Sequence, residues 1–176
     1  MDLYKFHSNP ETLYGHDIAY ETVPELVYKI AKSGKKLTDK QEDTIAKSPE
    51  YAFKYTNNVL MKPWTKGEDA IAKNPEYAYR YALYVLEKSF PKGEAVISKD
   101  PYYAYEYACY VLKKPWPKAE DAIVKNPHCA CWYAHNVLKK PWPKGEDTIA
   151  KDPKYAYYYA LNVLKLPEAE AERWPK

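Results

Sequence analysis

The chain has 176 residues, 46% of them hydrophobic and 29% charged, which is enough for one domain with a real core. Its formal net charge of +3 does not by itself imply a nucleic-acid partner. It has no run of 18 apolar residues to span a membrane, and its start, MDLYKFHSNP, lacks the regions of a signal peptide. With three cysteines, an odd number, we expect a soluble cytoplasmic protein without a disulfide framework.

Residues 1–35 are predicted to hold an N-terminal segment and a degenerate capping repeat. No pattern assigns residues 1–23. The stretch PELVYKIAKSG, which begins at Pro24, is typical of a shortened helix. Gly34 is expected just past the end of this helix, where the chain adopts a left-handed conformation that glycine tolerates.

Residues 36–165 carry a repeat of 26 residues. Prolines recur at this interval, namely Pro49, Pro75, Pro101, Pro127 and Pro153. Each proline follows a residue that caps a helix N-terminus well, namely Ser48, Asn74, Asp100, Asn126 and Asp152. We expect a long helix in each unit, such as residues 75–87, and then a short helix after a Trp-Pro turn, as in PKAEDAIVK. A period of 20 to 50 residues predicts a solenoid or an array.

Residues 166–176 are predicted to form a polar C-terminal capping helix, because LPEAEAE aligns with the WPKAEDA of an earlier unit. The expected fold is therefore all-α: a right-handed α-solenoid of tandem helix-turn-helix repeats, each a short helix plus a long helix, with degenerate capping units. The long helices are expected to line one face.

When the units are aligned on their prolines, each position forms a column, and the columns that do not vary between units indicate the scaffold. The third residue after the proline is always alanine, and the sixth is always tyrosine, as Ala104 and Tyr107 illustrate. We expect the tyrosine rings to fill the space between neighbouring repeats, with hydroxyls that reach solvent or a backbone carbonyl of the next unit.

Counted from the proline, positions one, five, eight, nine and twelve share the helix side opposite the alanines, and most of them vary between units. Stacked units would align these variable positions into one face, which indicates a binding surface. Extended faces of this kind are how solenoids bind partners. The alternative is that these positions are merely exposed and unconstrained, against which Trp132 and Tyr158 argue, because large aromatic residues are favoured as interface anchors. The residues expected to contact a protein partner are Lys54, Arg80, Tyr84, Tyr110, Trp132, His135 and Tyr158.

Catalytic and metal chemistry find little support. His128, Cys129, Cys131 and His135 lie in one predicted helix and suggest zinc, with Cys109 one unit earlier. However, Cys129 and Cys131 stand where other units place core-like aromatic residues, so buried apolar filling is the favoured interpretation. The sequence has no Gly-rich phosphate loop, GxSxG or HExxH motif. We expect neither an enzyme, nor a cofactor, nor a bound metal.

A single-stranded nucleic-acid or nucleotide partner is the alternative to a protein. Lysines recur after the tryptophan and at the end of the long helix, as Lys118 and Lys113 illustrate, and with the tyrosines they resemble an electrostatic track with stacking rings. The acids of the short helices lie close in sequence and would neutralise such a ridge, whereas non-specific binding needs uncompensated charge.

The phrases KKPWPKGEDTIAKDPKYAYYYALNVLK and KKPWPKAEDAIVKNP resemble a family of tandem repeats seen in bacteriophage and mobile-element proteins. In that family a WPEAE-like turn alternates with a DP-x-x-AYYYA-like helix. The resemblance covers residues 36–172 and implies an αα solenoid of viral or prophage origin, with no family-wide functional residues. It also implies a phage-encoded protein that binds, and in doing so inhibits, a host protein such as a defence component. Phe90 and Cys129 depart from the pattern.

Overall fold

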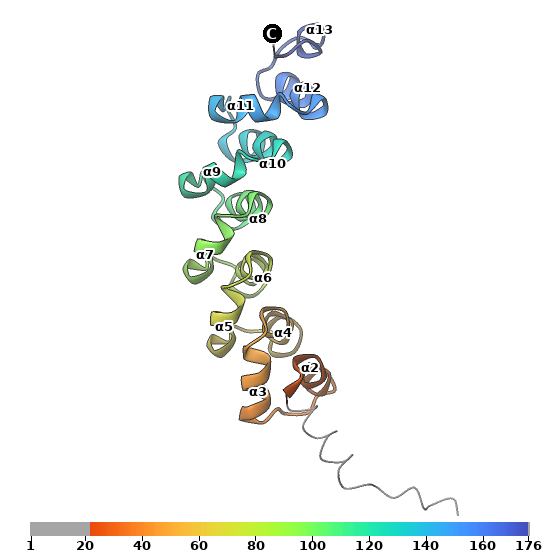
Figure 1. The fold of residues 1–176 in the computed structure, drawn as a ribbon, viewed down its shortest axis with the longest axis vertical. Coiled ribbons are helices and arrows are strands. Elements are labelled where there is room, and N and C mark those ends of the chain that lie inside the picture. Colours follow the sequence, from red (N-terminus) through yellow and green to blue (C-terminus); the bar gives the residue numbers. More distant parts are fainter. Residues whose placement is uncertain (1–21, 176) are drawn as a thin grey trace, which may run out of the picture. The chain divides into compact units, whose positions relative to one another are not determined.

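The computed structural model describes residues 22–175, and every regular element within them is helical (Figure 1). The chain divides into two compact units, Met1–Ile71 and Ala72–Lys176. The N-terminal segment that the sequence leaves unassigned lies outside the described residues, except for Thr22 and Val23.

Within residues 22–71, the described part of the first unit, four α-helices are present. They are α2 (Pro24–Lys32), α3 (Asp39–Ala46), α4 (Pro49–Tyr55) and α5 (Thr65–Ile71). The predicted capping helix is confirmed as α2, and Gly34 follows it with a φ of 84°. The helix α3 begins with a capping box, in which Thr38 and Gln41 each accept a backbone N–H of the other.

The second unit alternates two series of helices, as the repeat predicts, and those of the long series, except the last, comprise an α-helical part and a π-helical turn that follows it. The long series is α6 (Pro75–Tyr81), α8 (Pro101–Glu106), α10 (Pro127–Trp132) and α12 (Pro153–Asn162). The short series is α7 (Pro91–Ile97), α9 (Glu120–Ile123), α11 (Pro143–Ile149) and α13 (Glu168–Ala171). Successive long helices contact one another, and α6, α8 and α10 each contact the short helix that follows (Figure 1). This all-helical tandem packing is as expected, while a solenoid path and its handedness stay predictions.

The predicted caps are present at the start of the long helices. Asn74 and Asn126 each accept one backbone N–H through the side chain, and Asp100 and Asp152 each accept two. Each capping residue is extended and is followed by proline, whose missing N–H costs nothing at this position. The residue at which each long helix begins is thus determined by local sequence.

The long helices do not stay α-helical to their ends, which the sequence did not indicate. A π-helical turn follows α4, α6, α8 and α10, at Thr56–Leu60, Ala82–Leu86, Tyr107–Leu112 and Tyr133–Leu138. The next residue is left-handed and is not glycine, with φ between 50° and 54°. Lys113 and Lys139 occupy this position, and Lys165 has the same conformation after α12. These lysines therefore mark the ends of the long helices.

The alanine and tyrosine columns form the core. Ala104, Tyr107, Ala130 and Tyr133 have no exposed surface. The hydroxyl of Tyr133 accepts the backbone N–H of Trp116 at 2.8 Å and donates to Glu120 Oε1 at 3.2 Å. The expectation that these hydroxyls reach solvent or a carbonyl is thus wrong, because a fully buried hydroxyl must find partners inside the fold.

The same arrangement recurs elsewhere in the second unit. The Tyr107 hydroxyl accepts the backbone N–H of Phe90 and donates to the carboxylate of Glu94. The Tyr159 hydroxyl makes the same two bonds with Trp142 and Glu146. These glutamates in the first turn of a short helix thus have a packing role in addition to matching the helix dipole.

Glycine lies where a short helix closely approaches an aromatic ring, at Gly67, Gly93 and Gly145. A Cβ on Gly93 would lie 2.7 Å from both the Cβ of Ala78 and the ring of Phe90. Ala119 holds this position in the third repeat, and there the first turn, Pro117–Ala119, is a 3-10 helix. The glycine column therefore reflects close packing.

Candidate binding surface

Two of the predicted contact residues are occupied by ion pairs within their own helices. Lys54 on α4 donates to Glu50, and Arg80 on α6 lies 2.9 Å from Glu76. Both pairs join the first and fifth positions after the helix proline, an i,i+4 spacing. Each pair joins opposite charges, so these two helix faces are nearly neutral, and partly exposed pairs of this kind contribute little stability.

Further along the chain, the fifth position carries an aromatic residue on two helices, Trp132 on α10 and Tyr158 on α12. The Trp132 ring lies 4.7 Å from the ring of Tyr158, and His135 lies 5.7 Å from Trp132 and 5.5 Å from Tyr158, centroid to centroid. Three of the seven predicted contact residues therefore form one cluster, which joins α10, the turn that follows it and α12. All three side chains are partly exposed.

A groove of about 330 Å³ lies beside this cluster. It is lined from α8 and the turn after it by Tyr102, Glu106 and Tyr110, and from α10 by His128 and Trp132, with contributions from Tyr105 and Asn136. Tyr102 is 48% exposed and Tyr110 is 49% exposed, so two large rings at its border are open to solvent. Tyr110 was predicted as a contact residue, whereas Tyr102, Glu106 and His128 were not.

Glu106 is the only acidic residue that lines this groove. It accepts a hydrogen bond from the Tyr79 hydroxyl at 3.0 Å and has no ion pair among residues 22–175. Its charge is the largest cause of the raised pKa of Tyr102, and it contributes after Cys109 to the raised pKa of Tyr110. The carboxylate thus lies close to both exposed phenols.

The sequence does contain a signal for this site. Tyr102, Glu106 and Tyr110 are spaced at i, i+4 and i+8, which places them on one side of a helix. Comparison of the first and fifth positions in each unit would also have shown that Glu106 lacks the partner that Lys54 and Arg80 have.

Of the seven predicted contact residues, Tyr110 and Trp132 line this groove, and His135 and Tyr158 adjoin it through their ring contacts with Trp132. The other three, Lys54, Arg80 and Tyr84, are not among its lining residues. Tyr84 is 61% exposed, in the turn after α6. Lys54 belongs to the first unit. The second unit therefore brings together Tyr110, Trp132, His135 and Tyr158 from the predicted set.

No family model, curated protein or solved structure matches the chain. The interpretation of the surface therefore rests on its own chemistry and geometry, and the resemblance to phage repeat proteins stays a prediction.

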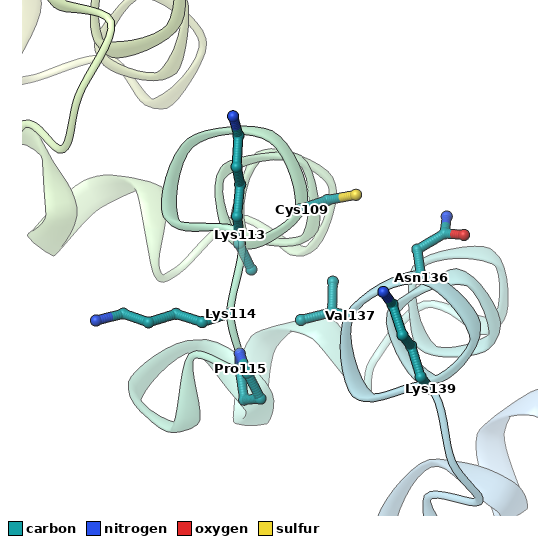
Figure 2. A pocket seen from close by; sticks show the side chains of 8 residues that line it. Cys109, Lys113, Lys114, Pro115, Asn136, Val137 and Lys139 are labelled. Atoms are coloured by element: carbon teal, nitrogen blue, oxygen red, sulfur yellow. The ribbon is translucent and has the colours of Figure 1, made fainter.

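A second kind of groove lies between the ends of neighbouring long helices. One, of about 310 Å³, is lined by Cys109, Lys113, Lys114, Asn136 and Lys139, together with Ala108, Pro115 and Val137 (Figure 2). Figure 2 shows Lys113 and Lys139 extending from two adjacent helix ends, while Lys114 points to another side. A related groove of about 170 Å³ is lined by Lys139 and Lys165.

The two predicted lysine columns differ in charge compensation. Lys144, in the column after the tryptophan, lies 2.8 Å from Asp121. Lys113 and Lys139 form no ion pair within the part of the chain that the structure describes. The expected neutralisation of lysine charge by the acids of the short helices therefore applies at Lys144 and does not extend to Lys113 and Lys139 at the helix ends.

The cysteines that suggested zinc are mostly buried. Cys129 and Cys131 are at most 1% exposed, which confirms them as core residues, and burial raises the pKa of each to about 12. Within residues 22–175, no group of three or more metal-ligating side chains comes together. No helix in this range is both long enough and apolar enough to span a membrane.

Proposed function

We propose that the protein is a non-enzymatic protein-binding module whose contacts are made by an aromatic surface on the second unit. This aromatic surface consists of Tyr102, Glu106, Tyr110, His128, Trp132, His135 and Tyr158. The single observation that carries the proposal is the partly exposed Trp132–Tyr158 pair beside an open groove with two half-exposed tyrosines. Tryptophan and tyrosine are enriched among the residues that dominate binding energy at protein interfaces.

The scaffold beneath this surface supports the proposal because it holds the side chains in place before binding. The helices α10 and α12 are capped by Asn126 and Asp152, and the buried Tyr133 and Tyr159 are hydrogen-bonded through their hydroxyls. A surface that is already ordered loses less conformational entropy on association. The resemblance to phage repeat proteins favours a host protein, such as a defence component, as the target.

The proposal is tested by comparing a double variant, Trp132→Ala with Tyr158→Ala, with the unaltered chain. The tagged chain captures partners from nuclease-treated lysate, and the affinity of each captured protein is then measured with purified components. We expect the double variant to bind at least about tenfold more weakly, since anchor residues of this type cost 2 kcal/mol or more. Met61→Ala, at an 80% exposed residue of the first unit, is the control. Equal affinity of the double variant for every captured protein contradicts the proposal.

A nucleic-acid partner remains the second candidate, and the uncompensated lysines at the helix ends favour it. The test is the binding of a fluorescent single-stranded oligonucleotide at low salt, followed by anisotropy. A Lys113→Glu, Lys139→Glu double variant should then lose most of its affinity, since non-specific binding depends on the number of phosphates neutralised. A Lys125→Glu, Lys151→Glu variant makes the same charge change at exposed residues elsewhere. Equal losses in the two variants, or no binding by the unaltered chain, reject this candidate.

A further inference from the structure

We propose that the groove lined by Tyr102, Glu106, Tyr110, His128 and Trp132 receives one cationic side chain, a lysine or an arginine, from the protein partner. This inference rests on the proposed function and specifies what the aromatic surface recognises.

The groove carries a negative charge. In α4 and α6 a charged residue at the fifth position is matched by one at the first position, as in the Arg80–Glu76 pair. In α8 the fifth position is Glu106, and the first position is Tyr102, which carries no counter-charge. Glu106 therefore presents an uncompensated negative charge at a partly buried position.

Aromatic rings line the same groove. Tyr102 and Tyr110 lie one helical spacing before and after Glu106, and Trp132 faces the same groove from α10. Aromatic rings attract cations through the negative charge of their faces, most strongly for tryptophan. A carboxylate and several such rings around one space form a combination suited to a positive group.

Other occupants fit the groove less well. A phosphate would be repelled by Glu106, whereas Lys113 and Lys139 line a separate groove that could attract one (Figure 2). A purely apolar side chain would strip water from the carboxylate without replacing it, which leaves a buried charge unpaired. The nearby Arg80 does not fill the groove, because its guanidinium is held by Glu76 at 2.9 Å.

The groove is also small. Sites for drug-sized ligands range from about 300 to 1,000 Å³, and this groove, at about 330 Å³, is at the lower limit. It is also open to solvent along Tyr102 and Tyr110, which are each about half exposed. A single side chain that projects from a partner surface fits both features.

The experiment is a titration of the full chain with three small probes, followed by amide and indole N–H signals in NMR spectra. The probes are the N-acetyl, N-methylamide derivatives of lysine, arginine and norleucine, and norleucine is the neutral control of similar length. We expect millimolar binding of the two cationic probes, with shifts centred on Tyr102, Tyr110 and Trp132. Norleucine should bind several-fold more weakly. Equal binding of all three probes, or shifts centred elsewhere, overturns the inference.

A matched pair of variants tests the carboxylate. Glu106→Gln keeps the shape of the side chain and should weaken the lysine probe by about fivefold. Glu172→Gln makes the same change at an exposed residue just after α13, and it should have no effect. Unchanged probe affinity in Glu106→Gln, with spectra that show an intact fold, overturns the inference.

The same variants separate this inference from the proposed function. If the Trp132→Ala, Tyr158→Ala variant loses the partner while Glu106→Gln keeps it at full affinity, the protein is a binding module that does not recognise a cation here. If inorganic phosphate or an oligonucleotide shifts the groove signals and the lysine probe does not, the inference is wrong and the nucleic-acid candidate gains support.

Discussion

Replacing Tyr133 by phenylalanine tests the hydrogen-bond network that joins neighbouring repeats. The change removes one oxygen from a side chain with no exposed surface and keeps the ring, which packs 5.2 Å from Trp142. Without the hydroxyl, the backbone N–H of Trp116 loses its acceptor at 2.8 Å and Glu120 loses a donor at 3.2 Å. An unsatisfied buried donor costs about 1 to 3 kcal/mol, so we expect a loss near 2 kcal/mol.

The assay is urea unfolding followed by circular dichroism at 222 nm, with a thermal melt as a second measurement. For a chain of this length, 1 kcal/mol corresponds to a Tm change of about 2 to 4 °C, so Tyr133→Phe should lower the Tm by about 4 to 8 °C. Tyr84→Phe, at a 61% exposed residue, is the control and should change stability by less than about 0.5 kcal/mol. If both variants unfold at the same urea concentration, the network does not stabilise the fold and the argument is refuted.

Three other perturbations follow from the buried positions. Ala104→Leu adds bulk at a residue with no exposed surface and should cost about 1 to 3 kcal/mol by urea unfolding, while an unchanged midpoint would contradict close packing there. Burial raises the pKa of Tyr133 from its ordinary 10.0 to about 12. The unfolded chain thus releases this proton first, so the contribution of Tyr133 to stability should be constant below about pH 10 and fall as the pH rises to 12, measured as the difference in unfolding between the unaltered chain and Tyr133→Phe across that range. At pH 8 a thiol reagent should modify the half-buried Cys109 well before Cys129 and Cys131, and equal rates for all three would contradict their burial.

The sequence predicted those parts of the fold that depend on local chemistry. The caps, the prolines and the left-handed Gly34 follow from residues within a few positions of each other, and all are present. Burial of Cys129 and Cys131 followed from the columns they occupy. The grouping of Trp132, His135 and Tyr158 required only the helix period and the repeat length.

Other features depend on contacts that no local pattern encodes. The hydroxyl of Tyr133 meets partners 17 and 13 residues earlier in the chain, and nothing near Tyr133 identifies them. The π-helical turns also escaped prediction, since residues such as Ala82–Leu86 have ordinary α-helical preferences. Glu106 was overlooked because its importance lies in the absence of a partner four residues earlier.

The tyrosine network also determines how such an array can change in length. Trp116 and Glu120 are satisfied by Tyr133 on the next long helix, so a turn and its short helix depend on the helix that follows them. A deletion that begins or ends within a unit would separate such partners, whereas the removal or duplication of exactly 26 residues would restore each tyrosine to an equivalent N–H and carboxylate. We therefore expect genetic rearrangement to lengthen or shorten this protein in whole repeats, and each added repeat would supply a new set of variable positions on which selection can act.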